Sequence, residues 1–306
     1  MSVAAKVGRK TIRITNGCVN MVVLIVLILL LSFGCYAVWD SGQVHGAASS
    51  RNYEIYRPTA ENDAASFADL QAINPDVFAW LNVYGTNIDY PVVQGQDNIR
   101  YVNTDAKGSY SLSGAIFLDY RSCPRFSDFS SIFYGHHMHN QVMFGEIELF
   151  ADRSYFDARR YGMLYFGGQE HGLEFFAFVH ADAYDMSVFR VNITGAEQQQ
   201  DYLNLLMQMA MHIREDVVVT PDDRIVLLST CSPSSTNGRD ILIGRITDET
   251  HSDPFAAEQT ERPSAIPGID ALPGWWTLWL RAGVIALLLL LILLAAVLIY
   301  TKRQRR

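Results

Sequence analysis

The sequence has few cysteines, and this scarcity excludes one class of fold. Only four occur in 306 residues, and two of them, Cys18 and Cys35, fall within an apolar run. A small domain held together by several disulfides is therefore excluded. A Cys123–Cys231 disulfide and two free thiols are the remaining alternatives. We expect free thiols, because the residues around Cys231 indicate a nucleophile, which a disulfide would block.

Acidic residues are absent from both ends of the chain. Residues 1–39 contain four basic residues and residues 273–306 contain five, with no acid in either stretch. The 233 residues between them carry 15 basic and 32 acidic groups, a formal net charge of −17. Because such a surface repels polyanions, the sequence argues against a nucleic-acid partner.

Two apolar runs, residues 18–38 and 275–300, are each long enough to cross a bilayer as a helix. Basic residues precede the first run, within residues 1–17, and follow the second run, within residues 301–306. The positive-inside rule then places both termini in the cytoplasm and the acidic middle of the chain outside. A cleaved signal peptide is the alternative for the first run, but that run is longer than a usual signal and no Ala-x-Ala motif follows it. We therefore expect a protein of the cell membrane with two spans.

Composition divides the chain between the two apolar runs into one domain and two connectors. Residues 39–62 are polar, with glycine, serine and asparagine, and residues 251–274 hold four of the ten prolines. Such stretches are typical of linkers. The predicted order is a cytoplasmic basic tail (1–17), a transmembrane helix (18–38), an extracytoplasmic stalk (39–62), a catalytic domain (63–250), a proline-rich tether (251–274), a second transmembrane helix (275–300) and a cytoplasmic basic tail (301–306).

The central domain is predicted to be mainly β with peripheral helices. Apolar spacing predicts helices at 63–73, 145–152 and 197–214. β-Branched and aromatic content predicts strands at 87–94, 115–119, 131–135, 173–183, 217–220, 224–230 and 241–246.

One predicted strand, Ile225-Val-Leu-Leu-Ser-Thr-Cys231, ends in a thiol beside a polar loop. An inert, buried cysteine is the plain alternative to a nucleophile. Because a free cysteine titrates near about 8.5, a thiol nucleophile needs an imidazole partner, and acyl transfer needs a donor for the oxyanion. His136 follows another predicted strand, and Arg239 opens the strand after the cysteine loop. Nucleophile, base and oxyanion donor are thus all present at strand ends.

Three neighbouring histidines, His136, His137 and His139, could also indicate a metal site. However, adjacent residues of a strand point to opposite faces, and no pattern of cysteines or carboxylates accompanies them, so we expect no metal. From these residues alone, either His136 or His137 could be the base. Arg239 could instead form a surface salt bridge, with Arg245 as the rival arginine.

These residues resemble the signatures of the sortase family. Leu227-Leu-Ser-Thr-Cys231 is similar to the family's T-L-x-T-C, with Leu227 in place of the usual threonine. Arg239 matches the family's arginine, and Tyr134-Gly-His136 matches the motif around its histidine. The resemblance covers roughly residues 66–247 and is strongest to class B sortases, in the stretches 74–81, 87–94, 113–119 and 143–145.

The resemblance implies a closed sortase-type β-barrel, flanked here by two transmembrane helices. It implies a cysteine transpeptidase in which Cys231 is the nucleophile, His136 the acid and base, and Arg239 the oxyanion donor, with Ser229 and Thr230 lining the substrate groove. The substrates would be surface proteins with a C-terminal sorting signal, and the acceptor an amine of a cell-wall precursor or a pilin lysine. No cofactor is implied. Two alternatives are a cysteine endopeptidase that uses water as the acceptor and a membrane-tethered interaction module without catalysis.

Overall fold

The computed structural model describes residues 3–58, 65–138, 141–233 and 235–256. Within these residues, eight strands close into a barrel in the order β5-β1-β2-β3-β4-β8-β9-β6, and β6 pairs again with β5. A further strand, β7 (Ala210–Ile213), pairs with β6 alone. The barrel strands are β1 (Val77–Val83), β2 (Asp89–Val93), β3 (Ile116–Leu118), β4 (Ser130–Tyr134), β5 (Tyr161–Phe166), β6 (Gln169–Asp182), β8 (Arg224–Cys231) and β9 (Gly238–Thr247).

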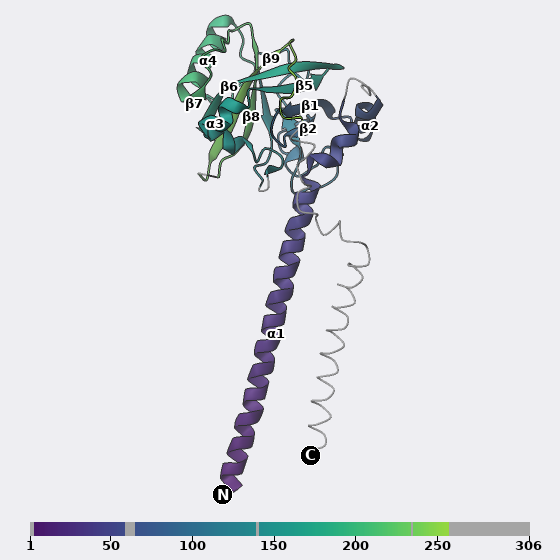
Figure 1. The fold of residues 1–306 in the computed structure, drawn as a ribbon, viewed down its shortest axis with the longest axis vertical. Helices are drawn as coiled ribbons and strands as arrows, with labels where there is room; N and C mark the ends of the chain where they lie inside the picture. The colour runs from purple at the N-terminus through teal and green to yellow at the C-terminus, as the bar shows by residue number, and fades with distance from the viewer. Residues whose placement is uncertain (1–2, 59–64, 139–140, 234, 257–306) are drawn as a thin grey trace. The chain divides into compact units, whose positions relative to one another are not determined.

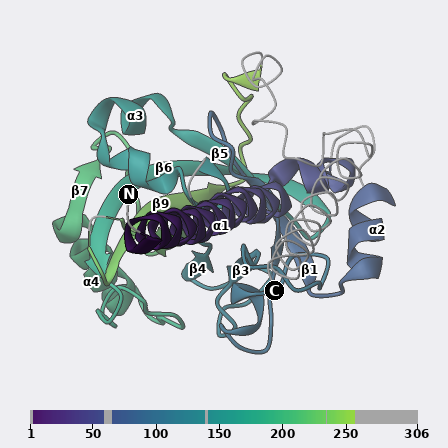
Figure 2. The same ribbon diagram turned by 90° about the horizontal axis from the view of Figure 1, so that it is seen from below.

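Short helices surround the barrel. Figures 1 and 2 show α3 and α4 on the side of β6 and β7, and α2 on the other side, near β1. Their bounds are α2 (Ala65–Ile73), α3 (Arg153–Ala158) and α4 (Ala196–Met209), and the 3₁₀ turns include η1 (Ser50–Tyr56), η2 (Arg100–Val102) and η4 (Ile147–Ala151). The predicted closed barrel with peripheral helices is therefore confirmed.

The N-terminal helix α1 (Val3–Ala47) contains the first predicted span. The stretch Thr11–Tyr56 includes an 18-residue window with a mean hydropathy of 2.8, none of it buried. Among the described residues this is the one helix long and apolar enough to cross a membrane, a test that a signal sequence also passes. The predicted second span, 275–300, and the tail 301–306 lie outside the described residues.

The apolar run of β8 is explained by burial on both of its faces. Val226 and Leu228 belong to the cluster that fills the barrel, whereas Ile225 and Leu227 belong to a second cluster. The second cluster lies between the outside of the sheet and the apolar face of α4, which contributes Tyr202, Leu203 and Leu206. A strand buried on both sides has no polar alternation, so β8 is held rigidly up to its last residue.

Two local predictions were wrong, and sheet pairing explains the first of them. The helix predicted at 197–214 ends at Met209, and the following residues form β7 against Ala177–Val179 of β6. β6 extends beyond its partner β5, and this free edge recruits β7. Residues 217–220 form no strand, whereas β1 and β5 were not predicted.

Both connectors contact the barrel in their described parts. The predicted stalk, 39–62, is helical as far as Ala47, and its residues Ala48 and Tyr53 are buried in the barrel's cluster. Of the predicted tether, residues 251–256 are described: the Tyr84 hydroxyl donates a 2.9 Å hydrogen bond to the His251 carbonyl, and Phe255 packs near Gly85. A compact unit therefore begins at Val44, before the predicted start of the catalytic domain at residue 63.

Candidate active site

Cys231 and Arg239 meet at one rim of the barrel. β8 and β9 are antiparallel, and their register pairs Cys231 directly with Arg239. The guanidinium Nη1 lies 3.0 Å from the Cys231 sulfur, which is exposed to solvent. The loop between the two residues closes on itself, because the Ser232 amide donates to the Gly238 carbonyl at 2.8 Å. A substrate carbonyl that reaches this exposed sulfur would therefore also lie beside the guanidinium.

His136 follows the neighbouring strand, β4, at the same rim. β4 runs parallel to β8, and the pairing extends past Tyr134 through a 3.3 Å bond from the Gly135 amide to the Ser229 carbonyl. The next residue is His136, so it leaves the sheet beside the end of β8. Within the described part of the chain, no hydrogen bond joins its ring directly to Cys231.

The His136 ring is oriented by a backbone group. Its Nε2 lies 2.8 Å from the carbonyl oxygen of Val102, at the end of η2. A carbonyl oxygen only accepts, so Nε2 carries the hydrogen and Nδ1 is the nitrogen available to exchange a proton. The sequence motif could not reveal this partner, because any residue at position 102 supplies a carbonyl.

His137 and Arg245, the alternatives to His136 and Arg239, each contact a carboxylate away from Cys231. The His137 ring lies 3.1 Å from the Glu148 carboxylate, and His139 is outside the described residues. Arg245 contacts Glu174 at 2.6 Å and also donates to the Val218 carbonyl. Of the two candidate arginines, Arg239 is therefore the one at the thiol.

Ser229 and Thr230, the predicted substrate-lining residues, are only 2% exposed. Their hydroxyl oxygens have no hydrogen-bond partner in the described protein.

Cys123 and Cys231 are not joined by the disulfide that the sequence left as an alternative, because both are free cysteines in the structure. The described residues contain no group of three or more histidine, cysteine or acidic side chains placed to hold a metal ion.

A buried carboxylate, which the sequence did not predict as part of the site, contacts the last residue of β4, two positions before His136. Asp119 is fully buried and accepts hydrogen bonds from the Tyr134 hydroxyl at 3.2 Å, from Asn98 at 3.0 Å and from Arg121 at 2.8 Å. Burial alone would raise the pKa of Asp119, but the bonds from Arg121 and Asn98 outweigh it and lower the pKa. Burial and the Asp119 charge raise the pKa of Tyr134, which therefore stays a donor. The stretch 113–119 was a motif in the sequence, but its role appears only when Asp119 meets Tyr134 across β3 and β4.

An exposed thiol beside a guanidinium, with an imidazole next to the same rim of a closed barrel, is the set of groups that cysteine-dependent acyl transfer would need. No family profile matches the chain. Sortase B of Listeria monocytogenes is 31% identical over 180 residues, which cover 58% of this chain and 72% of that protein. This chain belongs to the class B sortases, which are cysteine transpeptidases.

Two solved structures from streptococci support the same conclusion. The sortase B from the type II pilus of Streptococcus pneumoniae is 49% identical, with a TM-score of 0.53, and the match covers 60% of this chain and 100% of that one. A class B sortase of Streptococcus pyogenes involved in pilus biogenesis is 42% identical, with a TM-score of 0.54 and coverage of 59% and 97%.

Proposed function

We propose that this class B sortase cleaves the sorting signal of surface proteins at Cys231 and transfers the new acyl group to an amine. The observation that carries the proposal is the 3.0 Å contact between Arg239 Nη1 and the Cys231 sulfur. In a thioacyl intermediate, the carbonyl oxygen is only two bonds from the sulfur. A guanidinium that reaches the sulfur therefore also reaches the oxygen on which negative charge develops.

The chemistry divides into two half-reactions at one carbon atom. The Cys231 thiolate attacks the scissile carbonyl, the C–N bond breaks, and His136 protonates the leaving amine. An incoming amine then attacks the thioester and gives its proton to His136, and the thiolate leaves. Arg239 stabilises the oxyanion in both steps. Ser229 and Thr230, at the end of β8, would line the groove for the peptide.

A pilin lysine is the acceptor that we favour. Two relatives at 49% and 42% identity come from pilus systems. The amine of a cell-wall precursor is the other candidate, and both acceptors use the same second half-reaction.

The chain would act at a membrane surface. Helix α1 supplies an apolar anchor, and the basic residues before it favour a cytoplasmic N-terminus. With the second span at 275–300, whose apolar sequence supports it, both termini would be cytoplasmic and the catalytic domain, 63–250, extracytoplasmic.

The test uses the full chain in detergent, a library of candidate sorting-signal peptides, and hydroxylamine as the acceptor. Mass spectrometry would detect a cleaved peptide that ends in a hydroxamate. We expect this product from the wild type and its loss in Cys231→Ala and His136→Ala. Cleavage that yields only the free acid would make the protein an endopeptidase. Absence of a Cys231 adduct with every peptide, in a chain whose thiol is alkylated normally, would favour the interaction module.

A further inference from the structure

The segment that follows α1 contacts both loops that surround His136. We call residues 48–56 the docking segment. Ala48 is 1% exposed and Tyr53 is 6% exposed, and both belong to the cluster that fills the barrel. The segment is therefore part of the packed domain.

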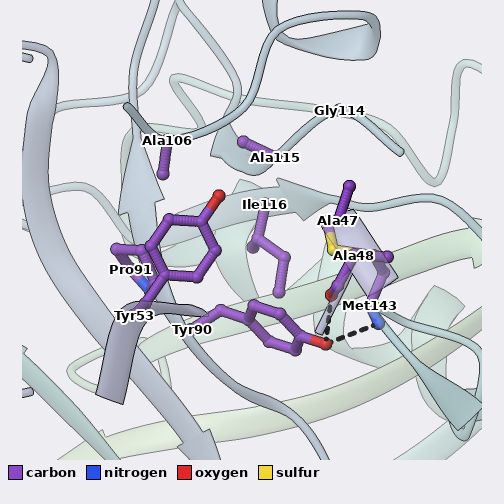
Figure 3. Close-up of a pocket in the computed structure, with 10 residues that line it drawn as sticks. All are labelled: Ala47, Ala48, Tyr53, Tyr90, Pro91, Ala106, Gly114, Ala115, Ile116 and Met143. Atoms are coloured by element: carbon purple, nitrogen blue, oxygen red, sulfur yellow. Dashed lines mark hydrogen bonds between the residues drawn. The ribbon is translucent and has the colours of Figure 1, made fainter. Parts of the chain in front are cut away.

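Its first connection runs through the hydroxyl of Tyr90, on β2. This hydroxyl donates to the Ala48 carbonyl at 2.9 Å and accepts from the Met143 amide, also at 2.9 Å (Figure 3). Tyr90 is 2% exposed, and burial raises its pKa, so the hydroxyl keeps its proton at neutral pH. One buried oxygen thus joins the docking segment to the loop after β4.

Met143 lies in the loop that carries His136. Its backbone has a φ of 54°, a left-handed conformation that is unfavourable for residues other than glycine. The next residue, Phe144, donates its amide to the His136 carbonyl at 3.1 Å, and Met143 forms a bridge with His137. The bond from Met143 to Tyr90 therefore holds a strained residue that is directly connected to His136.

The second connection reaches the loop that orients the His136 ring. Lys107 lies 5.5 Å from the ring centre of Tyr53 and 5.3 Å from that of Tyr56, and it donates to the Asn52 carbonyl at 3.3 Å. This loop begins at Val102, whose carbonyl accepts from His136.

The space under the docking segment is too small for a substrate. It is a void of about 10 Å³ lined by residues of both sides, among them Ala48, Tyr90 and Met143 (Figure 3). That volume is about enough for one water molecule. The contact is therefore a packed junction between the segment and the barrel.

We propose that Tyr90 is a positioning residue that makes the placement of His136 depend on docking of residues 48–56. The inference rests on the proposed function, because it takes His136 to be the general acid and base. With the segment docked, the Tyr90 hydroxyl is held by Ala48 and in turn holds Met143. With the segment displaced, Met143 loses this constraint, the Phe144 contact with His136 loosens and proton transfer slows. The segment directly follows α1, so its docking links the anchor helix to the activity.

The first experiment compares Tyr90→Phe with Tyr84→Phe in the full chain. Tyr84 is a matched control, because its hydroxyl donates a bond of equal length, 2.9 Å, to the His251 carbonyl in the other connector. Hydrogen exchange, read by mass spectrometry, would follow the amide of Phe144. We expect at least tenfold faster exchange in Tyr90→Phe and no change in Tyr84→Phe. Hydroxamate formation should show a kcat at least fivefold lower in Tyr90→Phe, with KM within twofold.

The second experiment displaces the segment without touching Tyr90. Ala48→Glu places a charge at a buried position, whereas Ile55→Glu places the same charge in the same segment at a position that is 73% exposed. We expect Ala48→Glu to reproduce the faster Phe144 exchange and the lower kcat, and Ile55→Glu to resemble the wild type. Thermal unfolding of each variant would show that the barrel is folded.

Two results would overturn the inference. One is wild-type exchange at Phe144 in Tyr90→Phe. The other is faster exchange in Tyr90→Phe but not in a folded Ala48→Glu, because Tyr90 would then act independently of the segment. Since exchange needs no substrate, these outcomes are separate from the proposed function, which fails if the wild type forms no thioacyl product.

Discussion

Arg239 is paired across two strands with Cys231, and its Nη1 lies 3.0 Å from the sulfur. Because both side chains emerge from paired positions of a rigid hairpin, the distance between them is set by the sheet register. A change at either position should therefore affect the chemistry far more than the fold.

Replacing Arg239 tests its role as the oxyanion donor. Loss of one such donor lowers kcat by about 10²- to 10³-fold, and we expect Arg239→Gln to fall in that range. Arg239→Lys should be intermediate, because lysine keeps the charge but not the planar fork of donors. Hydroxamate formation by the full chain measures both. Arg224→Gln, a change of an arginine at the start of β8, is the control and should stay within twofold. Wild-type turnover in Arg239→Gln would refute the role.

Alanine substitutions of His136 and His137 should have clearly different effects on kcat. We expect His136→Ala to lower kcat by about 10²- to 10⁴-fold, the usual contribution of general acid–base catalysis. His137→Ala should retain most of the activity, because its ring is already engaged by the Glu148 carboxylate, 3.1 Å away. The same hydroxamate assay decides the matter, and the reverse pattern would give the role to His137.

Asp119 should make stability depend on pH in the acid range. Its pKa is lowered in the folded protein, so the folded state binds fewer protons than the unfolded state near that pKa. Its contribution is fully present above the ordinary carboxyl pKa, about 3.9, and is lost as the pH falls through the lowered value. We expect Asp119→Asn to cost about 1 to 3 kcal/mol at pH 7, because the partners of a buried acceptor are left poorly satisfied.

Thermal unfolding of the full chain in detergent at pH 7 and at pH 3 would measure this effect. The difference between Asp119→Asn and the wild type should shrink at the lower pH. Asp248→Asn is the control, since that side chain is 93% exposed, and it should change stability little at either pH. A difference that grows on acidification would contradict the sign of the pKa shift.

Cys123 should be reactive without being catalytic. Hydrogen bonds from Ser127 and from Arg125 lower the pKa of the Cys123 thiol, so iodoacetamide should label Cys123. It should also label Cys231, which is exposed to solvent. We expect Cys123→Ser to turn over within twofold of the wild type, whereas Cys231→Ala is inactive. Peptide mapping without reductant should find both thiols free, and a linked Cys123–Cys231 peptide would overturn this prediction.

The sequence alone was sufficient for the features that depend on local pattern. The apolar run before Cys231 predicted a buried strand, because burial on both faces removes polar alternation. The motifs at Cys231, His136 and Arg239 predicted the family and named the candidate site, since each motif is contiguous. The long apolar run within α1 was equally visible.

Only the tertiary structure decided the relationships between distant residues. The Val102 carbonyl that orients His136 lies 34 positions earlier in the chain, and a backbone group leaves no mark in the residue types. Strand β7 replaced the end of a predicted helix because the free edge of β6 offered hydrogen bonds that local periodicity does not encode. The stretch predicted to be a stalk packs against the barrel because Tyr90 and Lys107, far along the chain, supply its partners. Local propensity depends on residues that are close in the sequence, whereas sheet register and packing depend on contacts between segments that are far apart in it.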